Sequence, residues 1–177
     1  QKTSFKDTRT VAVSEGSKQF LENLSLWTSL EAYSQPIKHI KVYDRTSKNR
    51  ISFSNETKNQ KLGYVIENRI ISKILMDKLK KLKNLKFFYG FDLTNIEIDD
   101  NSSRIFSKRQ IINSSLIIAA DGKNSEIKKK VGNKTFKKTY NESALVLNFI
   151  HEKNLNNTAY EIFYKSGPLA ILPMLPI

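Results

Sequence analysis

The stretch Leu116-Ile117-Ile118-Ala119-Ala120-Asp121-Gly122 decides the fold that this sequence predicts. Five consecutive apolar residues are typical of a strand in a parallel sheet that is covered on both faces. Asp121-Gly122 is a common turn dipeptide, and residues 123–128 then favour a short helix. Because open α/β sheets bind ligands at the carboxyl ends of their strands, we expect Asp121 at the edge of a ligand cleft.

The turn after this predicted strand has two interpretations. Gly122 lets the backbone come close to a ligand, and the N-terminus of the following helix attracts phosphate. Asp121 would then accept a hydrogen bond from a sugar hydroxyl. The alternative is structural, because an Asp-Gly pair more often marks a turn than a site.

Composition limits the classes of protein and site. The chain has 177 residues, no cysteine and two histidines, His39 and His151. Its length permits one domain or parts of two. The absence of cysteine excludes disulfides and thiol nucleophiles, and two distant histidines lead us to expect no metal site. The longest apolar run is far shorter than the ~20 residues of a membrane-spanning helix, and the first residues lack the apolar core of a secretory signal.

The net charge of +13 raises the question of an anionic partner, since a basic field attracts nucleic acid or anionic lipid. Of the 30 basic residues, 24 are lysine and 6 are arginine, whereas phosphate-reading surfaces favour arginine. Basic and aromatic residues come together only at 80–89, a pattern better explained by a helix end that runs into a strand. We therefore expect no nucleic-acid binding.

Apolar spacing predicts the remaining elements. One helix includes positions 20–30 and is capped by Ser14 or Ser17, and a second covers 70–82. An antiparallel hairpin is expected at 40–53, with a polar tip at 45–50, and a β-meander at about 92–112. Further strands are expected at 85–89, 144–149, 159–163 and 169–172, and Gly132 is expected to end the short helix.

Four stretches, in their order along the chain, resemble the flavoprotein aromatic hydroxylases, the class A flavoprotein monooxygenases. The resemblance is strongest to the ubiquinone-biosynthesis branch, the 2-octaprenyl-phenol hydroxylase family. The stretches are DTRTVAVSEGS at 7–17, LGYVIENR at 62–69, the Asp121-Gly122 segment and GPLAILP at 167–173. One match would be weak, but four in the family's order are far more specific.

The resemblance implies a p-hydroxybenzoate hydroxylase-like α/β fold. Part of a Rossmann-like FAD/NAD(P)-binding domain, residues 1–36 and 62–132, would be interleaved with a mostly antiparallel β-sheet substrate domain, residues 37–61 and 133–177.

The resemblance also implies which residues bind the cofactor. Arg9 is expected near the flavin, and Arg69 is expected to contact the cofactor from a helix N-terminus. Asp121 and Gly122 match a pair that serves both the flavin and the nicotinamide nucleotide. Lys128 stands where the family usually has arginine, so the charge is kept but the bidentate geometry is lost.

On the substrate side, the resemblance places Gly167, Pro168 and Leu169 beside the isoalloxazine ring. A structural turn and strand is an equally good explanation of this segment. No catalytic side chain is expected, because the flavin supplies the chemistry.

The implied activity is the hydroxylation of a polyprenylated phenol in ubiquinone biosynthesis, with FAD, NAD(P)H and O₂. The implied location is cytoplasmic, with peripheral contact on the inner membrane face, because polyprenyl tails lie in lipid. The oligomeric state is left open. A non-enzymatic basic α/β binding or interaction module, for a membrane surface or nucleic acid, is the alternative.

The sequence also departs from the family. Its six glycines never lie within two residues of each other, so the G-x-G-x-x-G fingerprint is absent, as is the family's later Gly-Asp segment. We therefore expect a central fragment of such an enzyme.

We predict that the 177-residue chain by itself does not retain FAD, because its sequence lacks the fingerprint that holds the pyrophosphate. Titration of the purified chain with FAD, followed by flavin fluorescence, tests this. Tight stoichiometric binding would contradict it.

Overall fold

The computed structural model describes residues 7, 9–55, 60–132 and 134–175. Thr8 of the first family-like stretch and residues 1–6, 56–59, 133 and 176–177 of the predicted domain ranges lie outside the described residues. The chain divides into two compact units, one formed by residues 2–85 with 145–177 and the other by residues 86–144.

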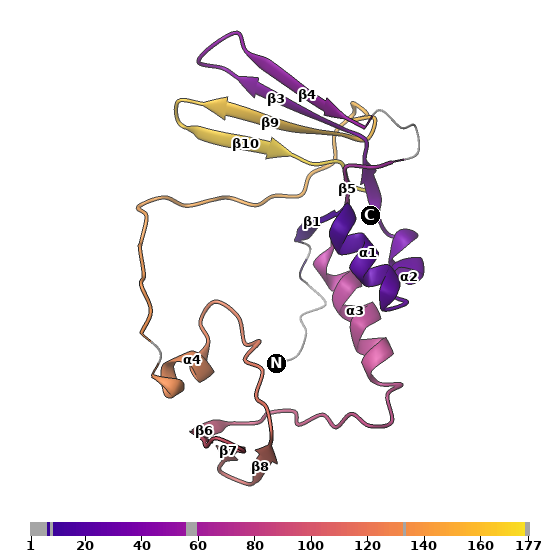
Figure 1. Ribbon diagram of the computed structural model, residues 1–177. Coiled ribbons are helices and arrows are strands. Elements are labelled where there is room, and N and C mark those ends of the chain that lie inside the picture. The colour runs from indigo at the N-terminus through magenta and orange to yellow at the C-terminus, as the bar shows by residue number, and fades with distance from the viewer. Residues whose placement is uncertain (1–6, 8, 56–59, 133, 176–177) are drawn as a thin grey trace. The chain divides into compact units, whose positions relative to one another are not determined.

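The first unit contains a three-stranded antiparallel sheet with β5 (Gly63–Glu67) between β1 (Thr10–Ser14) and β2 (Gln35–Ile37). Three helices belong to the same unit: α1 (Glu15–Asn23), α2 (Trp27–Glu31) and α3 (Asn68–Leu79) (Figure 1). The residues from Gly63 to Ile66 are all buried. β5 is thus the buried central strand of this unit.

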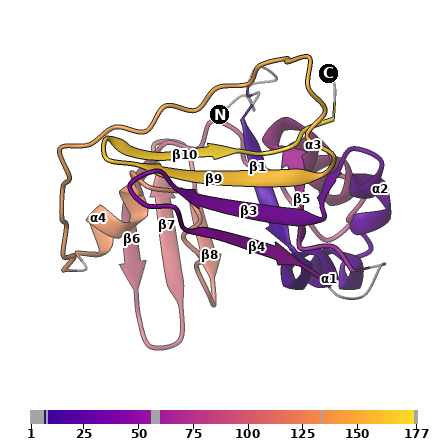
Figure 2. The ribbon, with the colours of Figure 1, turned by 90° about the horizontal axis from the view of Figure 1, so that it is seen from above.

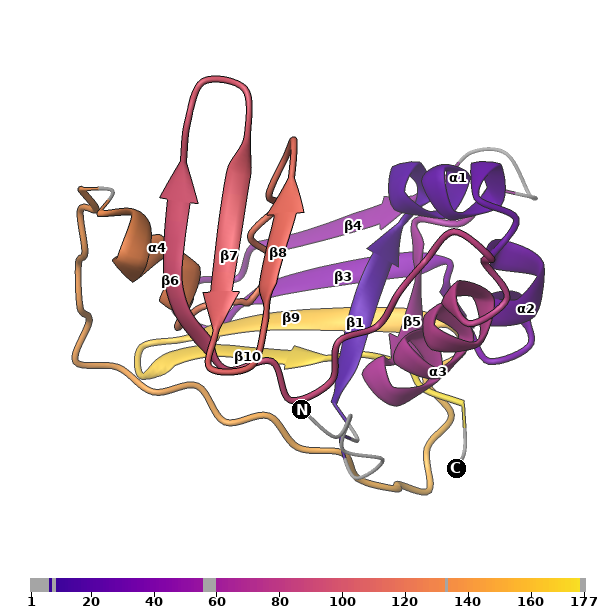
Figure 3. The same cartoon turned by 90° about the horizontal axis from the view of Figure 1, so that it is seen from below.

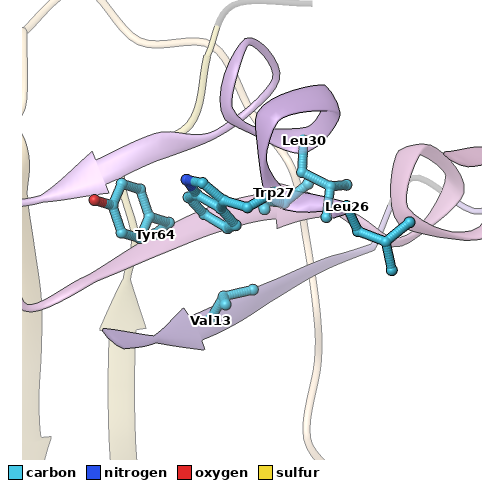
Figure 4. Packing of buried hydrophobic residues seen from close by; sticks show 6 residues of the cluster. Val13, Leu26, Trp27, Leu30 and Tyr64 are labelled. Carbon is cyan, nitrogen blue, oxygen red and sulfur yellow. The ribbon is translucent and has the colours of Figure 1, made fainter. Parts of the chain in front are cut away.

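The side chains of β5 alternate between two hydrophobic clusters. Tyr64 makes an edge-to-face contact with Trp27, with ring centroids 4.7 Å apart, in a cluster between the sheet and the helices (Figure 4). The other buried members of that cluster are Val13, Leu26, Leu30 and Ile66. On the opposite face, Val65 packs with Ile37 and Ala159. Both faces of β5 are therefore covered.

A second sheet in this unit has the order β10 (Gly167–Ile171), β9 (Thr158–Tyr164), β3 (His39–Asp44) and β4 (Arg50–Ser54) (Figure 2). β3 and β4 form the antiparallel hairpin that the sequence predicts. β9 and β10 form another hairpin, and β9 pairs with β3 in parallel. The strands predicted at 159–163 and 169–172 thus join the predicted hairpin in one sheet.

Only Lys38 separates β2 from β3, so the chain passes directly from one sheet to the other. The backbone N–H groups of Lys38 and His39 both donate to the carbonyl oxygen of Asn157, at 2.8 and 3.3 Å. The side chain of Gln35 also donates to that of Asn157. These bonds hold the start of β9 against the junction of the two sheets.

The unit of residues 86–144 contains β6 (Leu93–Ile98), β7 (Ser103–Ser107) and β8 (Ile111–Ser114), followed by α4 (Glu126–Val131). The three strands form an antiparallel meander, which confirms the prediction for 92–112 (Figure 3). The ammonium group of Lys130 donates to the carbonyl oxygen of Thr94 at 2.8 Å, which ties α4 to β6.

The sequence predicts several of the residues at which the helices begin or end. The Ser14 hydroxyl accepts a hydrogen bond from the Ser17 N–H at 3.2 Å and caps α1. Gly132, at φ 73°, ends α4 in the left-handed conformation. α3 covers most of the predicted range 70–82 and begins two residues earlier.

The first predicted helix is wrong in one respect, because it is broken between α1 and α2. Ser25 adopts a positive φ of 54°, which interrupts the helix. Phe20 and Leu24 are consequently exposed, at 63% and 46%, whereas Trp27 and Leu30 are buried as expected.

Three predicted strands are not formed. Residues 116–120, which were expected to be a buried strand, have no regular structure, and Leu116 and Ile118 are 73% and 80% exposed. The segments 85–89 and 144–149 are also irregular. In the described part of the chain no strand pairs with any of these segments, and an unpaired strand leaves its backbone groups unsatisfied. The parallel pairing expected around Asp121 is found instead between β3 and β9.

We predict that Gly63→Ala destabilises the unit that contains β5. A Cβ at this position would lie 2.8 Å from the carbonyl oxygen of Val13 in the paired strand, so β1 and β5 would have to separate. We expect a loss of about 1–3 kcal/mol in the free energy of unfolding. Urea unfolding followed by the fluorescence of Trp27, the only tryptophan, measures it.

Gly16→Ala is the matched control, because a Cβ there meets no atom within 4 Å. In a helix this change is expected to stabilise by roughly 0.5–1 kcal/mol. Equal unfolding midpoints for the two variants would contradict the prediction.

Candidate functional site

The turn before α4 is held together by its own side chains. Asp121 Oδ2 accepts hydrogen bonds from the N–H groups of Glu126, at 2.7 Å, and Ile127, at 3.2 Å. Ser125 Oγ accepts from the Lys128 N–H at 3.0 Å. The expectation that this helix end offers free N–H groups to phosphate is therefore wrong for these three groups.

These bonds also set the charge of Asp121. The hydrogen bond with the Ser125 side chain lowers the pKa of this carboxyl below its ordinary value, and it outweighs desolvation, which raises the pKa. The backbone N–H groups of Ile127 and Glu126 lower the pKa further. Bonds that favour the charged form have this effect. Asp121 is thus a carboxylate at neutral pH.

Asp121 lines a pocket of about 490 Å³ within the unit of residues 86–144. Asp121, Gly122, Ser125 and Lys128 belong to its lining. Its apolar wall comes from Ile96 and Ile98 of β6, Ile117 and Ala119 of the irregular segment, and Ile127 and Val131 of α4. The structure therefore brings together three of the five predicted cofactor residues, Asp121, Gly122 and Lys128.

The sequence did not predict that side chains of β6 would line this pocket. The alternation of Ile96 and Ile98 predicted a strand of the meander, but nothing in it indicated which element would face these side chains. A mostly apolar pocket of this size with a few polar groups is typical of sites for small organic ligands. A flat ring with a hydroxylated or anionic group attached fits this distribution.

Arg9 and Arg69 lie at one end of the sheet that contains β5. Arg9 forms a bidentate ion pair with Asp7, through Nε at 2.8 Å and Nη2 at 2.7 Å. Arg69 forms a bidentate pair with Glu67 through Nε and Nη2. The Asn68 N–H donates to the carbonyl oxygen of Arg9 at 2.9 Å, so the two pairs stand at adjacent strand ends.

These pairs change the interpretation of both arginines. The side-chain and backbone hydrogen bonds with Arg9 hold the pKa of Asp7 at about 2. The positive charge of Arg69, near the N-terminus of α3, opposes the helix dipole. Glu67 supplies the compensating negative charge. The contacts of Arg9 and Arg69 with a cofactor stay predictions.

Gly167, Pro168 and Leu169 begin β10, and Gly167 has a φ of 132°. Leu169 pairs with Ile162, so the two side chains lie on one face of the sheet, and Pro168 lies on the other. Tyr160 shares the face of Leu169 and stacks on Tyr43, with ring centroids 6.3 Å apart. The segment therefore begins a strand, and its contact with a substrate stays a prediction. Leu169 also belongs to an apolar and aromatic face.

Two further observations concern the described residues. No group of three or more His, Cys, Asp or Glu side chains among them comes together as metal ligands would. No helix within the described ranges has both the length and the hydropathy that crossing a bilayer requires.

We predict that the backbone N–H signals of Glu126 and Ile127 titrate with Asp121, at a midpoint below the ordinary pKa of 3.8. Because the folded pKa is lowered, the stabilisation of α4 is present above the ordinary pKa and is lost as the pH falls through the folded pKa. NMR of the ¹⁵N-labelled chain measures the midpoint.

Ser125→Ala provides the comparison, because Ser125 makes the largest contribution to the lowered pKa. This variant should move the midpoint up toward 3.8. A wild-type midpoint at or above the ordinary value, or one that Ser125→Ala leaves unchanged, would contradict the prediction.

Comparison with protein families gives a match to the family described as FAD binding domain, over residues 1–174. Among individual relatives, the chain is 30% identical over 169 residues to the ubiquinone hydroxylase UbiL of Rhodospirillum rubrum, which covers 95% of this chain and 39% of the relative. It is 27% identical to the mitochondrial ubiquinone biosynthesis monooxygenase COQ6 of Danio rerio, with 94% of this chain and 37% of the relative covered. The chain thus spans about two fifths of the length of these relatives.

Solved structures show the same fold. Klebsiella pneumoniae HpxO, in a complex with FAD and uric acid, matches with a TM-score of 0.61 and 14% identity, over 93% of this chain and 43% of that protein. The tetracycline destructase Tet(55) matches with a TM-score of 0.55 and 14% identity, over 97% of this chain and 44% of that protein. The predicted fold class, a flavoprotein-hydroxylase type of α/β fold, is confirmed.

Proposed function

The chain belongs to the FAD binding domain family, and we propose that it works as part of a flavin-dependent monooxygenase. The enzyme would use NAD(P)H and O₂ to hydroxylate a polyprenylated phenol in ubiquinone biosynthesis. The observation that carries the proposal is the extent of the similarity, because the match to ubiquinone hydroxylases includes nearly all of both units.

The pocket beside α4 supports a nucleotide site. Its apolar wall suits a flat base, and the carboxylate of Asp121 suits a sugar hydroxyl. Gly122, at φ 84°, leaves open space where a side chain would stand, so a ligand can approach the backbone. Because Asp121 and Ser125 already occupy the N–H groups of Glu126, Ile127 and Lys128, the side-chain charge of Lys128 is left to attract a phosphate.

Arg9 and Arg69 would contribute positive charge to the flavin site. Each guanidinium is oriented by the carboxylate of Asp7 or Glu67, which reduces the entropy that a ligand contact would otherwise cost. The Arg9 side chain is 68% exposed, so the N–H groups that are not bonded to Asp7 are accessible. A phosphate or ring oxygen would share these arginines with their acidic partners.

When bound, the flavin supplies the redox chemistry and the activation of O₂. The protein's own contribution is to hold the phenol and to exclude water. Gly167 to Leu169 are proposed on the substrate side, where Leu169, Ile162 and Tyr160 share one face of the sheet and offer an apolar surface to an aromatic ring. No side chain is assigned the role of a nucleophile or a general base.

The proposal includes the division of the chain between two domains. Residues 1–36 and 62–132 would belong to the FAD-binding domain, and residues 37–61 and 133–177 to the substrate domain. The grouping of β3, β4, β9 and β10 in one sheet supports the second part.

Peripheral contact of the protein with the inner face of a membrane, from the cytoplasm, is also proposed. A net charge of +13 is attracted to anionic lipid, and the prenyl tail of the proposed substrate is soluble in lipid.

Expression of the whole gene that encodes this chain tests the function. The product should carry flavin, visible by absorbance, and should oxidise NAD(P)H faster when a short-chain prenyl phenol is added, with the hydroxylated phenol as product. Asp121→Asn keeps an acceptor for the N–H groups of α4 but removes the charge, and we expect it to weaken flavin or nicotinamide-nucleotide binding by about tenfold.

Two controls separate binding from capping. Asp100→Asn removes an exposed carboxylate from the turn between β6 and β7, and it should change nothing. Ser125→Ala removes the cap at the Lys128 N–H and leaves the charge of Asp121 in place, so it should weaken nucleotide binding less than Asp121→Asn does, although Ser125 lines the same pocket. A product without flavin, or without phenol-dependent oxidation of NAD(P)H, would end the proposal.

A further inference from the structure

The tip of the β3–β4 hairpin concentrates positive charge that nothing in the proposed cofactor site uses. Its sequence is Arg45-Thr46-Ser47-Lys48-Asn49-Arg50, and Asp44 is the only acidic residue from 39 to 54. Arg45, Lys48 and Arg50 are exposed. Two of the 6 arginines of the chain stand in this tip, Arg45 in the turn and Arg50 at the start of β4.

The backbone of this tip is fixed before any ligand arrives. Asp44 Oδ1 accepts from the Thr46 N–H at 2.8 Å and from its hydroxyl at 2.6 Å, and Oδ2 accepts from the Ser47 hydroxyl at 2.8 Å. The Arg45 N–H donates to the carbonyl oxygen of Phe163 in β9 at 2.9 Å. The tip is therefore anchored both internally and to the neighbouring strand.

The cations of the tip differ from most other arginines of the chain because they form no ion pair with a described carboxylate. Arg9, Arg69 and Arg104 each pair with a carboxylate. Among the described residues, no ion pair involves Arg45, Lys48 or Arg50. The carboxylate nearest in sequence, Asp44, is already bonded to Thr46 and Ser47.

Arg50 is also positioned. Its guanidinium carbon lies 5.7 Å from the ring centroid of Tyr43, and that ring stacks on Tyr160. A guanidinium held over a ring by a cation–π contact keeps the N–H groups at its edge available for hydrogen bonds. The hairpin residues 43–45 and 47–50 line a pocket of about 340 Å³.

We propose that this pocket binds a phosphate group, held by the forks of Arg45 and Arg50 and by the ammonium of Lys48. The planar guanidinium group of arginine can donate two hydrogen bonds to the oxygens of one phosphate. Because the backbone of the tip is already ordered and its cations have no ion-pair partner among the described residues, the free-energy cost of reorganising the site for an anion is small. The phosphate belongs either to a soluble ester or to the headgroup of an anionic lipid. The site lies on a different element from the proposed nucleotide pocket and does not depend on it.

The test uses the whole chain and two probes. Inorganic phosphate is titrated by calorimetry, and flotation measures binding to phosphatidylcholine vesicles with and without phosphatidylglycerol. We expect wild-type chain to bind at least one probe, and Arg45→Gln/Arg50→Gln to weaken that binding about tenfold or more. Arg109→Gln, which removes an exposed arginine from the β7–β8 turn, should leave it unchanged.

Arg45→Lys/Arg50→Lys keeps the charge but not the forks, and it should lose most of the phosphate binding. Unchanged emission of buried Trp27 establishes that each variant is folded. Binding of free phosphate assigns a soluble ester, and binding of phosphatidylglycerol vesicles alone assigns a lipid headgroup; both support the site. Binding of neither probe, or equal binding by the glutamine variant, would overturn the proposal.

Discussion

The burial of β5 on both of its faces is the constraint on which the larger unit depends. Tyr64 and Ile66 complete the cluster beneath the helices, and Val65 completes the cluster that includes Ile37 and Ala159. Since Ala159 belongs to the second sheet, the packing of one short strand links both sheets of the unit. The close approach of Gly63 to the Val13 carbonyl makes this arrangement possible, because only a residue without Cβ fits there.

The sequence contained most of the local structure. The hairpin of β3 and β4, the meander of β6 to β8, the N-terminal cap of α1 and the C-terminal end of α4 were all predicted, because each depends on residues close together in the chain. A strand covered on both faces was predicted at 116–120, but the strand with both faces covered is β5. The run 116–120 is the more apolar segment, but β5 finds partner strands on both sides and is therefore the strand that is buried. An apolar run indicates the tendency to be buried and not the presence of a partner.

In the candidate sites too, the sequence indicates contacts between residues close together in the chain and does not indicate contacts between distant ones. Asp121, Gly122 and Lys128 are close in sequence and line one pocket, and their contact with a cofactor stays a prediction. The isoleucines of β6 complete that pocket from a distance in sequence, and no local pattern reveals such a contact. For Arg9 and Arg69 the resemblance gave no indication of their partners, and the acid two residues before each arginine accounts for its orientation. The same bonds that make Asp121 a carboxylate also commit it to α4, so one side chain both stabilises a turn and presents charge to a pocket.

The parallel pairing of β3 with β9 has a consequence for the order of events during synthesis. Gln35 and Asn157, which meet at the junction of the two sheets, are 122 positions apart. Closing a loop of that length is slow relative to forming hairpins, and proteins rich in such distant contacts fold slowly. On the ribosome, β3, β4 and β5 emerge well before β9, so their apolar side chains stay exposed in the nascent chain until β9 is made. Until translation delivers Ala159, the exposed edge of β3 is a place where chaperones can act or where chains can aggregate.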